Sequence, residues 1–235
     1  MSELCRWLHE HLGELPLLRY PFDPNALPVT GVYFFYEDGE VWGHGGSSPR
    51  IVRTGTSRPG NFRIRIMEHF LSDERRVDFG GHDRKPSDRS IFRKNIGRAL
   101  LHRDGDEYLR VWEIDFTPKA NRDAHAHERD LDKERDLEAR ITEVLRSRFA
   151  FRYLMMHDEA EVLGRKKLEG RLIGTLGQCR LCGPSDGWLG QHSPKWKIST
   201  SGLWQEQHLT DEPINEIAQE ALVDAISRTK GWIGR

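Results

Sequence analysis

Two neighbouring segments decide the fold: "GVYFFYEDGE" at residues 31–40 and "RIVRTGTS" at residues 50–57. Each is an apolar run that ends in glycine and polar residues, which is the pattern of a β-strand followed by a turn. The loop between them, "VWGHGGSSP", is rich in glycine. The pair therefore predicts a β-hairpin. Tyr33 lies near the start of its first strand, and Arg53 lies two places before the glycine of its second.

Downstream of the hairpin the period of the apolar residues changes from two to about 3.6. Phe62, Ile66 and Phe70 fall on one face of a predicted helix. In a later helix, "SIFRKNIGRALL", Ser90 is a suitable N-cap. The other predicted helices cover residues 3–13, 121–149, 159–176 and 212–229. The alternating stretch "YLRVWEIDF", residues 108–116, predicts a third strand.

These elements predict an α+β fold, in which a small antiparallel three-stranded sheet is surrounded by helices. Three segments are expected. Residues 1–28 form a leading helix and linker. Residues 29–178 form the central domain, with a charged insertion at about 73–108, of which residues 73–89 are expected to be an exposed excursion. Residues 179–235 form a tryptophan-rich extension and a final helix that pack on that domain.

Composition excludes some classes of protein. The 235 residues are 37% hydrophobic and 31% charged, and no stretch approaches the ~20 apolar residues of a membrane span. The charged first residues do not fit a signal peptide. Three cysteines argue against a disulfide framework and predict a reducing, cytoplasmic location. The net charge of −1 does not indicate a nucleic-acid binder by itself, although locally basic stretches could form a basic face.

Four segments in order carry a resemblance: "GVY" at 31–33, "RTG" at 53–55, "RIRIMEH" at 63–69 and "KKLEGRLIGTL" at 166–176. They resemble the GIY-YIG nuclease family over roughly residues 29–178. Arg65 and His69 are similar to the arginine–histidine pair of its restriction-type members. The resemblance implies an endonuclease that cleaves DNA with Mg²⁺ or Mn²⁺ held by Glu169.

Phosphodiester hydrolysis gives each of these residues a chemical role. Tyr33 can act as general base, directly or through a water, and His69 can assist the proton transfer or orient the phenol. Arg53 and Arg65 can grip and neutralise the phosphate. Glu169 supplies a hard oxygen ligand of the kind Mg²⁺ prefers. The chain departs from the family pattern at Arg53, where a second tyrosine is usual, and this leaves room for altered or lost activity.

Basic residues outside this set are candidates for binding nucleic acid. Arg63 lies on the predicted helix that contains Phe62 and Phe70. The helix "SIFRKNIGRALL" could present a basic face to a DNA groove, since arginine and asparagine read base edges well. The members of that face are Arg93, Lys94, Asn95 and Arg98. A solvated helix surface is the equal alternative.

Two features of the extension remain open. Cys179 and Cys182 have the C-x2-C spacing of half a zinc site, which Cys5, His157 or His192 would have to complete. Reduced loop thiols are the favoured interpretation, and structural zinc is the alternative. Trp188 and Trp204 pack on the core or stack on a base, and packing is favoured.

Two other functions compete with cleavage. In the first, the chain is a nucleic-acid-binding module that keeps the fold but has lost catalytic turnover because Arg53 replaces the second tyrosine. In the second, it is an interaction protein that docks a partner with its tryptophan-rich tail. A single carboxylate–metal site cuts one strand at a time, so cleavage of both strands would need a homodimer or a second binding event. The acidic final helix is a candidate for pairing two copies.

Overall fold

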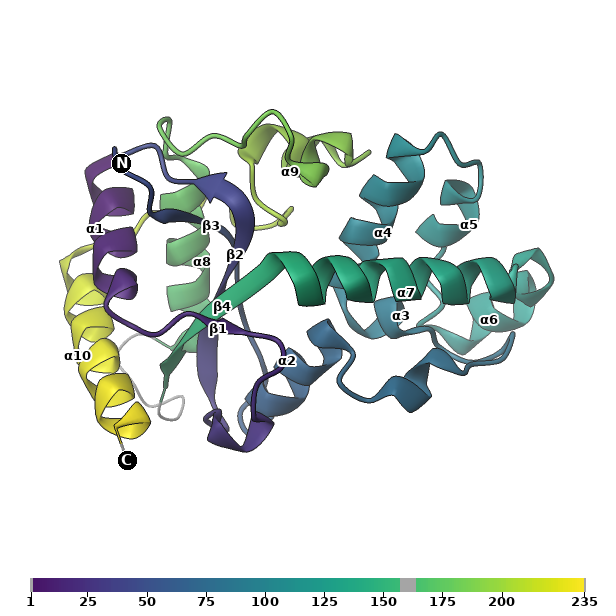
Figure 1. Cartoon of the computed structure of the whole chain (residues 1–235), viewed down its shortest axis with the longest axis horizontal. Coiled ribbons are helices and arrows are strands. Elements are labelled where there is room, and N and C mark those ends of the chain that lie inside the picture. Colours follow the sequence, from purple (N-terminus) through teal and green to yellow (C-terminus); the bar gives the residue numbers. More distant parts are fainter. Residues whose placement is uncertain (1, 157–163, 235) are drawn as a thin grey trace.

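The computed structural model describes residues 2–156 and 164–234 (Figure 1). Within these residues, four strands form one antiparallel sheet in the order β1-β4-β2-β3. The strands are β1 (Leu18–Arg19), β2 (Gly31–Val41), β3 (Pro49–Thr56) and β4 (Phe149–Met155). The hairpin predicted from the sequence is confirmed as β2 and β3.

The central strand β2 is buried on both of its faces, from Gly31 to Glu37. Aromatic and β-branched residues fill such a strand well because their side chains pack on a pleated surface. Tyr33 lies opposite Gly55 of β3 and Tyr153 of β4. Tyr36, three residues further on, belongs to the core of the other face, as the alternation of strand side chains predicts.

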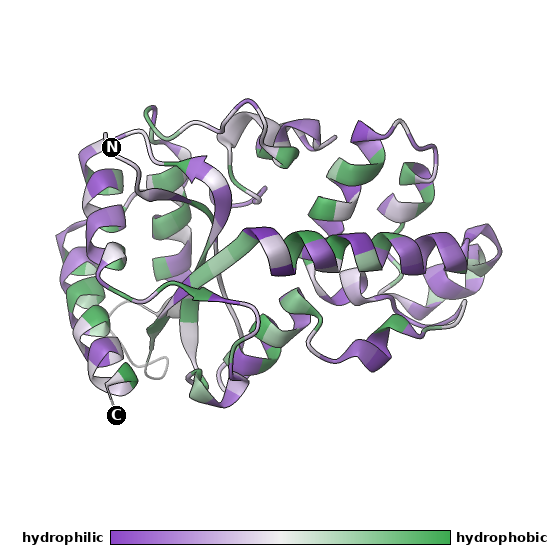
Figure 2. Ribbon diagram, in the orientation of Figure 1, coloured by the Kyte–Doolittle hydropathy of each residue, from purple (hydrophilic) through white to green (hydrophobic). Residues whose placement is uncertain are grey.

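Three helices pack on the face of the sheet that carries Tyr33: α2 (Phe62–Phe70), α4 (Ile91–Arg103) and α7 (Leu131–Arg148). Their core is aromatic, with Phe35 contacting the rings of Phe70 and Phe92. Ser90 caps α4 by accepting a hydrogen bond from the backbone N–H of Arg93, as predicted. Hydrophilic residues dominate the outer end of α7, away from the sheet (Figure 2).

The opposite face is covered by α1 (Ser2–Gly13), α8 (Arg165–Gly177) and α10 (Glu216–Ile233) (Figure 1). The N-terminal helix and the C-terminal helix contact each other there. The part of the chain after residue 178 therefore packs on both faces, because Trp188 and Trp204 belong to the first core and Leu222 to the second.

The remaining elements are short and connect the layers. They are η1 (Pro24–Ala26), η2 (Glu74–Val77), α3 (Pro86–Arg89), α5 (Leu109–Glu113), α6 (Lys119–His125), η3 (Ala126–Glu128), η4 (Leu189–His192) and α9 (Trp196–Ser201). No helix among the described residues is both long enough and apolar enough to cross a membrane.

The prediction of a strand at residues 108–116 is wrong, because this segment contains α5. Tyr108, Val111 and Trp112 are three and four residues apart, as on one helical face, and Trp112 packs closely over Gly97 of α4. The alternation came from Tyr108, Trp112, Ile114 and Phe116. Its indole N–H donates to the Lys94 carbonyl at 3.1 Å. The third long strand is instead β4, "FAFRYLM".

Two other predicted elements differ from the structure. The single helix over residues 121–149 is two helices, α6 and α7, because Asp130 caps a new start by accepting from the Lys133 N–H at 3.0 Å. The helix predicted from residue 159 is described only from Arg165. The insertion is also less exposed than expected, since Lys85 is fully buried beside the rings of Trp112 and Phe116.

Trp188 and Trp204 pack in the core, so the favoured prediction for them is confirmed. Both indole N–H groups donate to one oxygen of Glu37, at 2.9 and 3.0 Å. Burial is the main cause that raises the pKa of Glu37, and these donors counteract it. Neither ring is available to stack on a base or to dock a partner.

Candidate active site

Three polar side chains, Tyr33, His69 and Ser90, form a hydrogen-bonded chain that links β2, α2 and the start of α4. The Tyr33 hydroxyl is 3.0 Å from Nε2 of His69, and Nδ1 of His69 is 2.8 Å from the Ser90 hydroxyl. Tyr33 is 1% exposed, while His69 and Ser90 are fully buried. The hairpin, α2 and the start of α4 thus hold the phenol in one orientation.

His69 is neutral at physiological pH. Burial holds the pKa of His69 well below its ordinary value of 6.5. Three nearby guanidinium groups lower this pKa further: Arg65, Arg53 and Arg93. A neutral imidazole has one donor and one acceptor nitrogen. His69 therefore donates to one of the two hydroxyl groups, Ser90 or Tyr33, and accepts a hydrogen bond from the other.

Arg53 lies deep beside this chain. Its guanidinium donates to the Trp204 carbonyl and lies 4.9 Å from the centre of the Phe92 ring. Burial lowers the pKa of Arg53, and the neighbouring Tyr33 and Glu169 act in the opposite direction. Its buried Nε has no hydrogen-bond partner among the residues that the structure describes. Arg53 is therefore a buried cation close to Tyr33, with one donor still unused.

Arg65 and Glu169 line one open groove of about 400 Å³, which we call the Arg65–Glu169 groove. Its walls are Thr56, Ser57, Arg58, Asn61, Ile64, Arg65, Glu68, Lys166 and Glu169. Three of these side chains are basic and two are acidic. Arg65 also donates to the Arg89 carbonyl at 2.7 Å and pairs with Glu68 at 3.5 Å.

Local sequence explains why these two residues meet. Glu169 follows the fully buried Leu168 and precedes Leu172 by one turn, so it stands at the border of the face by which α8 packs on the sheet. That face contacts β3, whose end forms the groove at Thr56. Arg65 and His69 are four residues apart and share one face of α2. The Tyr33 hydroxyl, which contacts His69, therefore lies on the side of α2 from which Arg65 reaches the groove, although Tyr33 itself does not line it.

The donor set of the groove fits a hard divalent cation. Glu169 and Glu68 offer carboxylate oxygens, while Asn61 and Ser57 offer neutral oxygens on the same walls. Mg²⁺ usually takes one or two protein carboxylates and keeps several waters. Glu169, with Glu68 as a second candidate, could hold such an ion.

The basic face expected on α4 is not a nucleic-acid surface, so that prediction is wrong for its four residues. Each is buried, with between 0% and 7% exposure: Arg93, Lys94, Asn95 and Arg98. A helix surrounded by core on every side needs internal partners for its charges. Arg63, on α2, is half-buried and donates to the Leu27 carbonyl at 2.6 Å, outside the groove.

Those partners are acidic residues and carbonyls from other elements. Arg93 pairs with the fully buried Glu138 of α7 at 2.6 Å and donates to the His69 carbonyl at 3.0 Å. Arg98 makes a two-point contact with Glu113 at 2.8 and 2.9 Å. Arg93 thus fixes the end of α2, and with it His69, rather than contacting DNA.

Sequence reasoning missed several residues of the groove. Arg58, Asn61, Glu68 and Lys166 line it, yet they sit in a turn or among other charged helix residues. Arg58 and Asn61 belong to "TSRPGN", directly before α2, and Lys166 lies three residues before Glu169. Their position beside predicted site residues is the only signal in the sequence that could have marked them.

A second cluster of side chains shares no residue with the groove. Cys5, His44, Cys179 and Cys182 each offer one ligand atom, and these atoms all lie within 4.8 Å of one another. His44 was not among the expected partners of the C-x2-C pair. His192 is not in the cluster, and His157 lies outside the described residues.

Gly55→Ala is expected to displace Tyr33. A Cβ at residue 55 would lie 2.3 Å from the Tyr33 hydroxyl oxygen, which is far inside van der Waals contact. Overpacking of this kind costs about 1–3 kcal/mol of unfolding free energy. Thermal denaturation should therefore show a lower Tm. Gly13→Ala, where a Cβ meets nothing within 4 Å, is the matched control and should not lower the Tm.

Acid is expected to destabilise the fold through His69. Its pKa is lowered in the folded state, so below about pH 6.5 the unfolded chain binds a proton that the folded chain does not. This contribution should cost up to about 2 kcal/mol between pH 7 and pH 5, the limit set by the unfolded pKa of about 6.5. Urea denaturation at both pH values measures it, and His69→Gln should show a smaller loss between them. An equal loss in both proteins would contradict the buried, neutral imidazole.

Comparison with known proteins identifies one family. The family model described as the GIY-YIG domain matches residues 2–231. No curated protein and no solved structure matches the chain. The family match extends over the leading helix and the C-terminal extension as well as the hairpin, α2 and α8.

Proposed function

Because this chain belongs to the GIY-YIG domain family, whose members are generally endonucleases, we propose that it is a Mg²⁺-dependent endonuclease that hydrolyses phosphodiester bonds in DNA. One observation carries the proposal. Arg65 of α2 and Glu169 of α8, far apart in sequence, line one groove beside the buried Tyr33–His69 pair. Those are the groups that phosphodiester hydrolysis requires.

The groove suits a DNA backbone electrostatically. Arg58, Arg65 and Lys166 can meet the negative charge of the phosphates, and a guanidinium such as that of Arg65 can contact two phosphoryl oxygens at once. Glu169 and Glu68 would hold the divalent cation. When bound, Mg²⁺ supplies charge stabilisation for the phosphoryl group and the departing oxygen.

Tyr33 is the proposed general base, acting through one water that reaches it from the groove. In the assigned direction, Nδ1–H of His69 donates to Ser90 and Nε2 accepts the proton of the Tyr33 hydroxyl. As the phenolic oxygen takes a proton from that water, its own proton passes to Nε2 of His69, so that no second proton builds up on the phenol. His69 thus orients Tyr33 and receives its proton, and it contacts Tyr33 and not the substrate.

Arg53 takes a modified role at the position where the family usually has its second tyrosine. It is buried and bonded to the extension at the Trp204 carbonyl, so it acts behind the groove. From there its positive charge favours a build-up of negative charge on the Tyr33 oxygen. Direct grip of the phosphate falls to Arg65 and the other basic residues of the groove.

Nicking of supercoiled plasmid DNA tests the proposal. We expect conversion to the open-circular form in Mg²⁺ and none when Mg²⁺ is omitted or replaced by Ca²⁺. A single groove cuts one strand at a time, so a nick should precede any linear product. Omitting the ion is preferable to adding a chelator, because a chelator would also strip any metal held by the cysteine cluster. Absence of any product, on DNA of varied sequence, would refute cleavage.

Binding without cleavage is the second candidate function, and the burial of Arg53 and Tyr33 favours it. A chain of this kind would bind DNA in the groove with strong salt dependence and form no product. Fluorescence anisotropy of a labelled duplex at several salt concentrations, run beside the plasmid assay, separates the two functions. Salt-dependent affinity with no nicks would support the binding module.

A further inference from the structure

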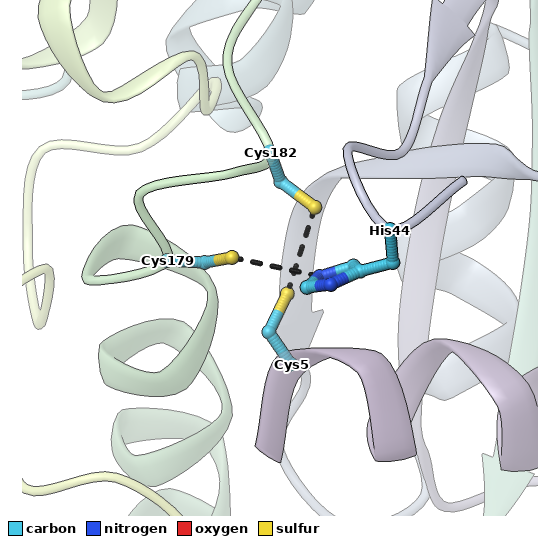
Figure 3. Close-up of side chains that lie close together, drawn as sticks. All are labelled: Cys5, His44, Cys179 and Cys182. Carbon is cyan, nitrogen blue, oxygen red and sulfur yellow. Dashed lines mark hydrogen bonds between the residues drawn. The ribbon is translucent and has the colours of Figure 1, made fainter. Parts of the chain in front are cut away.

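Three distant segments of the chain meet on the side of the sheet that α1 covers. Cys5 comes from the second turn of α1, His44 from the loop between β2 and β3, and Cys179 and Cys182 from the turn after α8 (Figure 3). All four side chains point toward one common point in the close-up. Cys5 and Cys182 are buried, and His44 and Cys179 are half-buried.

The spacing of the ligand atoms fits one tetrahedral ion. Sγ of Cys5 and Sγ of Cys182 are 3.8 Å apart, and Sγ of Cys179 is 3.6 Å from Nε2 of His44. Tetrahedral zinc, with bonds of about 2.3 Å to sulfur and 2.0 Å to nitrogen, would require about 3.8 Å and 3.6 Å. The four atoms lie too close together to enclose an iron–sulfur cluster, but they leave room for a single ion.

The cysteines are not arranged as a disulfide with a spare thiol. All three are free, and the 3.8 Å between the sulfurs of Cys5 and Cys182 is far above the ~2.05 Å of an S–S bond. The Gly43 N–H points at Sγ of Cys182 at 3.4 Å, a backbone contact that stabilises a thiolate ligand. This contact requires glycine, because a Cβ at residue 43 would lie 1.7 Å from the Leu181 carbonyl oxygen.

His9 lies beside the cluster but is already committed. Its Nδ1 is 2.9 Å from the Cys5 carbonyl, and its Nε2 accepts from the Ile51 N–H at 3.1 Å. Both ring nitrogens are thus used in holding α1 to β3. His44 is left as the imidazole that completes the set with the three sulfurs.

We propose that Cys5, His44, Cys179 and Cys182 bind one structural Zn²⁺ ion. Three thiolates and an imidazole fill all four positions of a tetrahedral site, which is the closed composition of structural zinc and leaves no position for a substrate. The ion joins α1, the β2–β3 loop and the start of the C-terminal extension. This proposal is independent of the proposed nuclease activity.

The site also has a consequence for the active site through the extension. Just after Cys182, Ser185 contacts Glu40 of β2, and further along Trp204 supplies the carbonyl that Arg53 contacts. Gln205 accepts from the Thr54 N–H at 2.9 Å. The zinc would fix the beginning of the segment whose later part lies against β3.

Metal analysis of the full chain tests the proposal. After purification with a reductant and equilibration with one equivalent of zinc, mass spectrometry of metals should find about one zinc per chain. Cys179→Ser and His44→Ala should lose most of it, whereas His82→Ala, a change at an exposed histidine, should keep it. His44→Cys preserves four ligands and should also keep it. Chelation should lower the Tm of the wild type by roughly 10 °C.

Two results would overturn the proposal. One is a reduced, folded wild type that holds no zinc after equilibration and keeps its Tm in chelator. The other is full zinc content in both His44→Ala and Cys179→Ser. If those variants do not fold, cobalt substitution of the wild type decides the question. Intense visible absorption from tetrahedral cobalt–thiolate supports the site, and the weak absorption of octahedral cobalt refutes it.

Discussion

Glu169→Gln should lower Mg²⁺-dependent nicking of plasmid DNA by about 10³-fold or more. The change keeps the size of the side chain but removes the charge with which Glu169 would hold the ion in the groove. A loss of this size corresponds to about 4 kcal/mol of transition-state stabilisation, which is within the range that a bound metal supplies. Initial nicking rates over a range of Mg²⁺ concentrations measure the effect.

The experiment also requires that Glu169→Gln still folds and still binds DNA. Removing a negative charge from a groove that binds phosphate should leave DNA affinity unchanged or raise it, as anisotropy without Mg²⁺ would report. Glu143→Gln, the same substitution at an exposed position of α7, is the matched control and should cut at the wild-type rate. Equal cleavage by wild type and Glu169→Gln would remove Glu169 from the proposed site.

Tyr33→Phe is expected to reduce nicking by about 10²–10⁴-fold, the usual contribution of general acid–base catalysis. The ring that packs in the core is kept, and only the oxygen that contacts His69 is lost. Single-turnover rates under saturating protein should fall, while affinity for DNA stays the same. The buried Nε2 of His69 loses its partner, so a decrease of about 1–3 kcal/mol in unfolding free energy should accompany the change.

A double variant distinguishes catalysis from a purely structural role. If His69 acts by orienting Tyr33, then His69→Gln should slow cleavage strongly in the wild-type background and little in Tyr33→Phe. Additive losses would mean that the two residues act separately. A Tyr33→Phe variant that nicks at the wild-type rate would make Tyr33 a core residue only, and the general base would have to be sought elsewhere.

Arg53, the residue at which the chain departs from the family pattern, contacts the C-terminal extension. Its partner is the carbonyl of Trp204, 151 residues away in sequence, and its ring contact is Phe92 of α4. Both contacts come from elements that flank the hairpin only in the folded chain. The sequence could mark Arg53 as unusual but could not indicate that it would be buried.

Prediction from the sequence succeeded where the decisive interactions are local. The hairpin, α2 and the Ser90 cap follow from turn residues, periodicity and a side chain that bonds its own helix. It failed at residues 108–116, where a short apolar pattern fits both periods and only packing of Trp112 against Gly97 selects the helix. It also failed for α4, whose basic residues resemble a solvated face until Glu138 and Glu113 are placed beside them.

The sequence by itself determined the order of the chemical groups and the elements that carry them: a tyrosine on a strand, an arginine–histidine pair on a helix and a glutamate on a later helix. Only the tertiary structure decided which of these groups share a groove, which basic residues are buried, and that Cys5 and His44 join Cys179 and Cys182. The physical reason is range. Strand and helix periodicity are set by neighbours within a few residues, whereas a groove or a four-ligand cluster depends on contacts between segments more than a hundred residues apart.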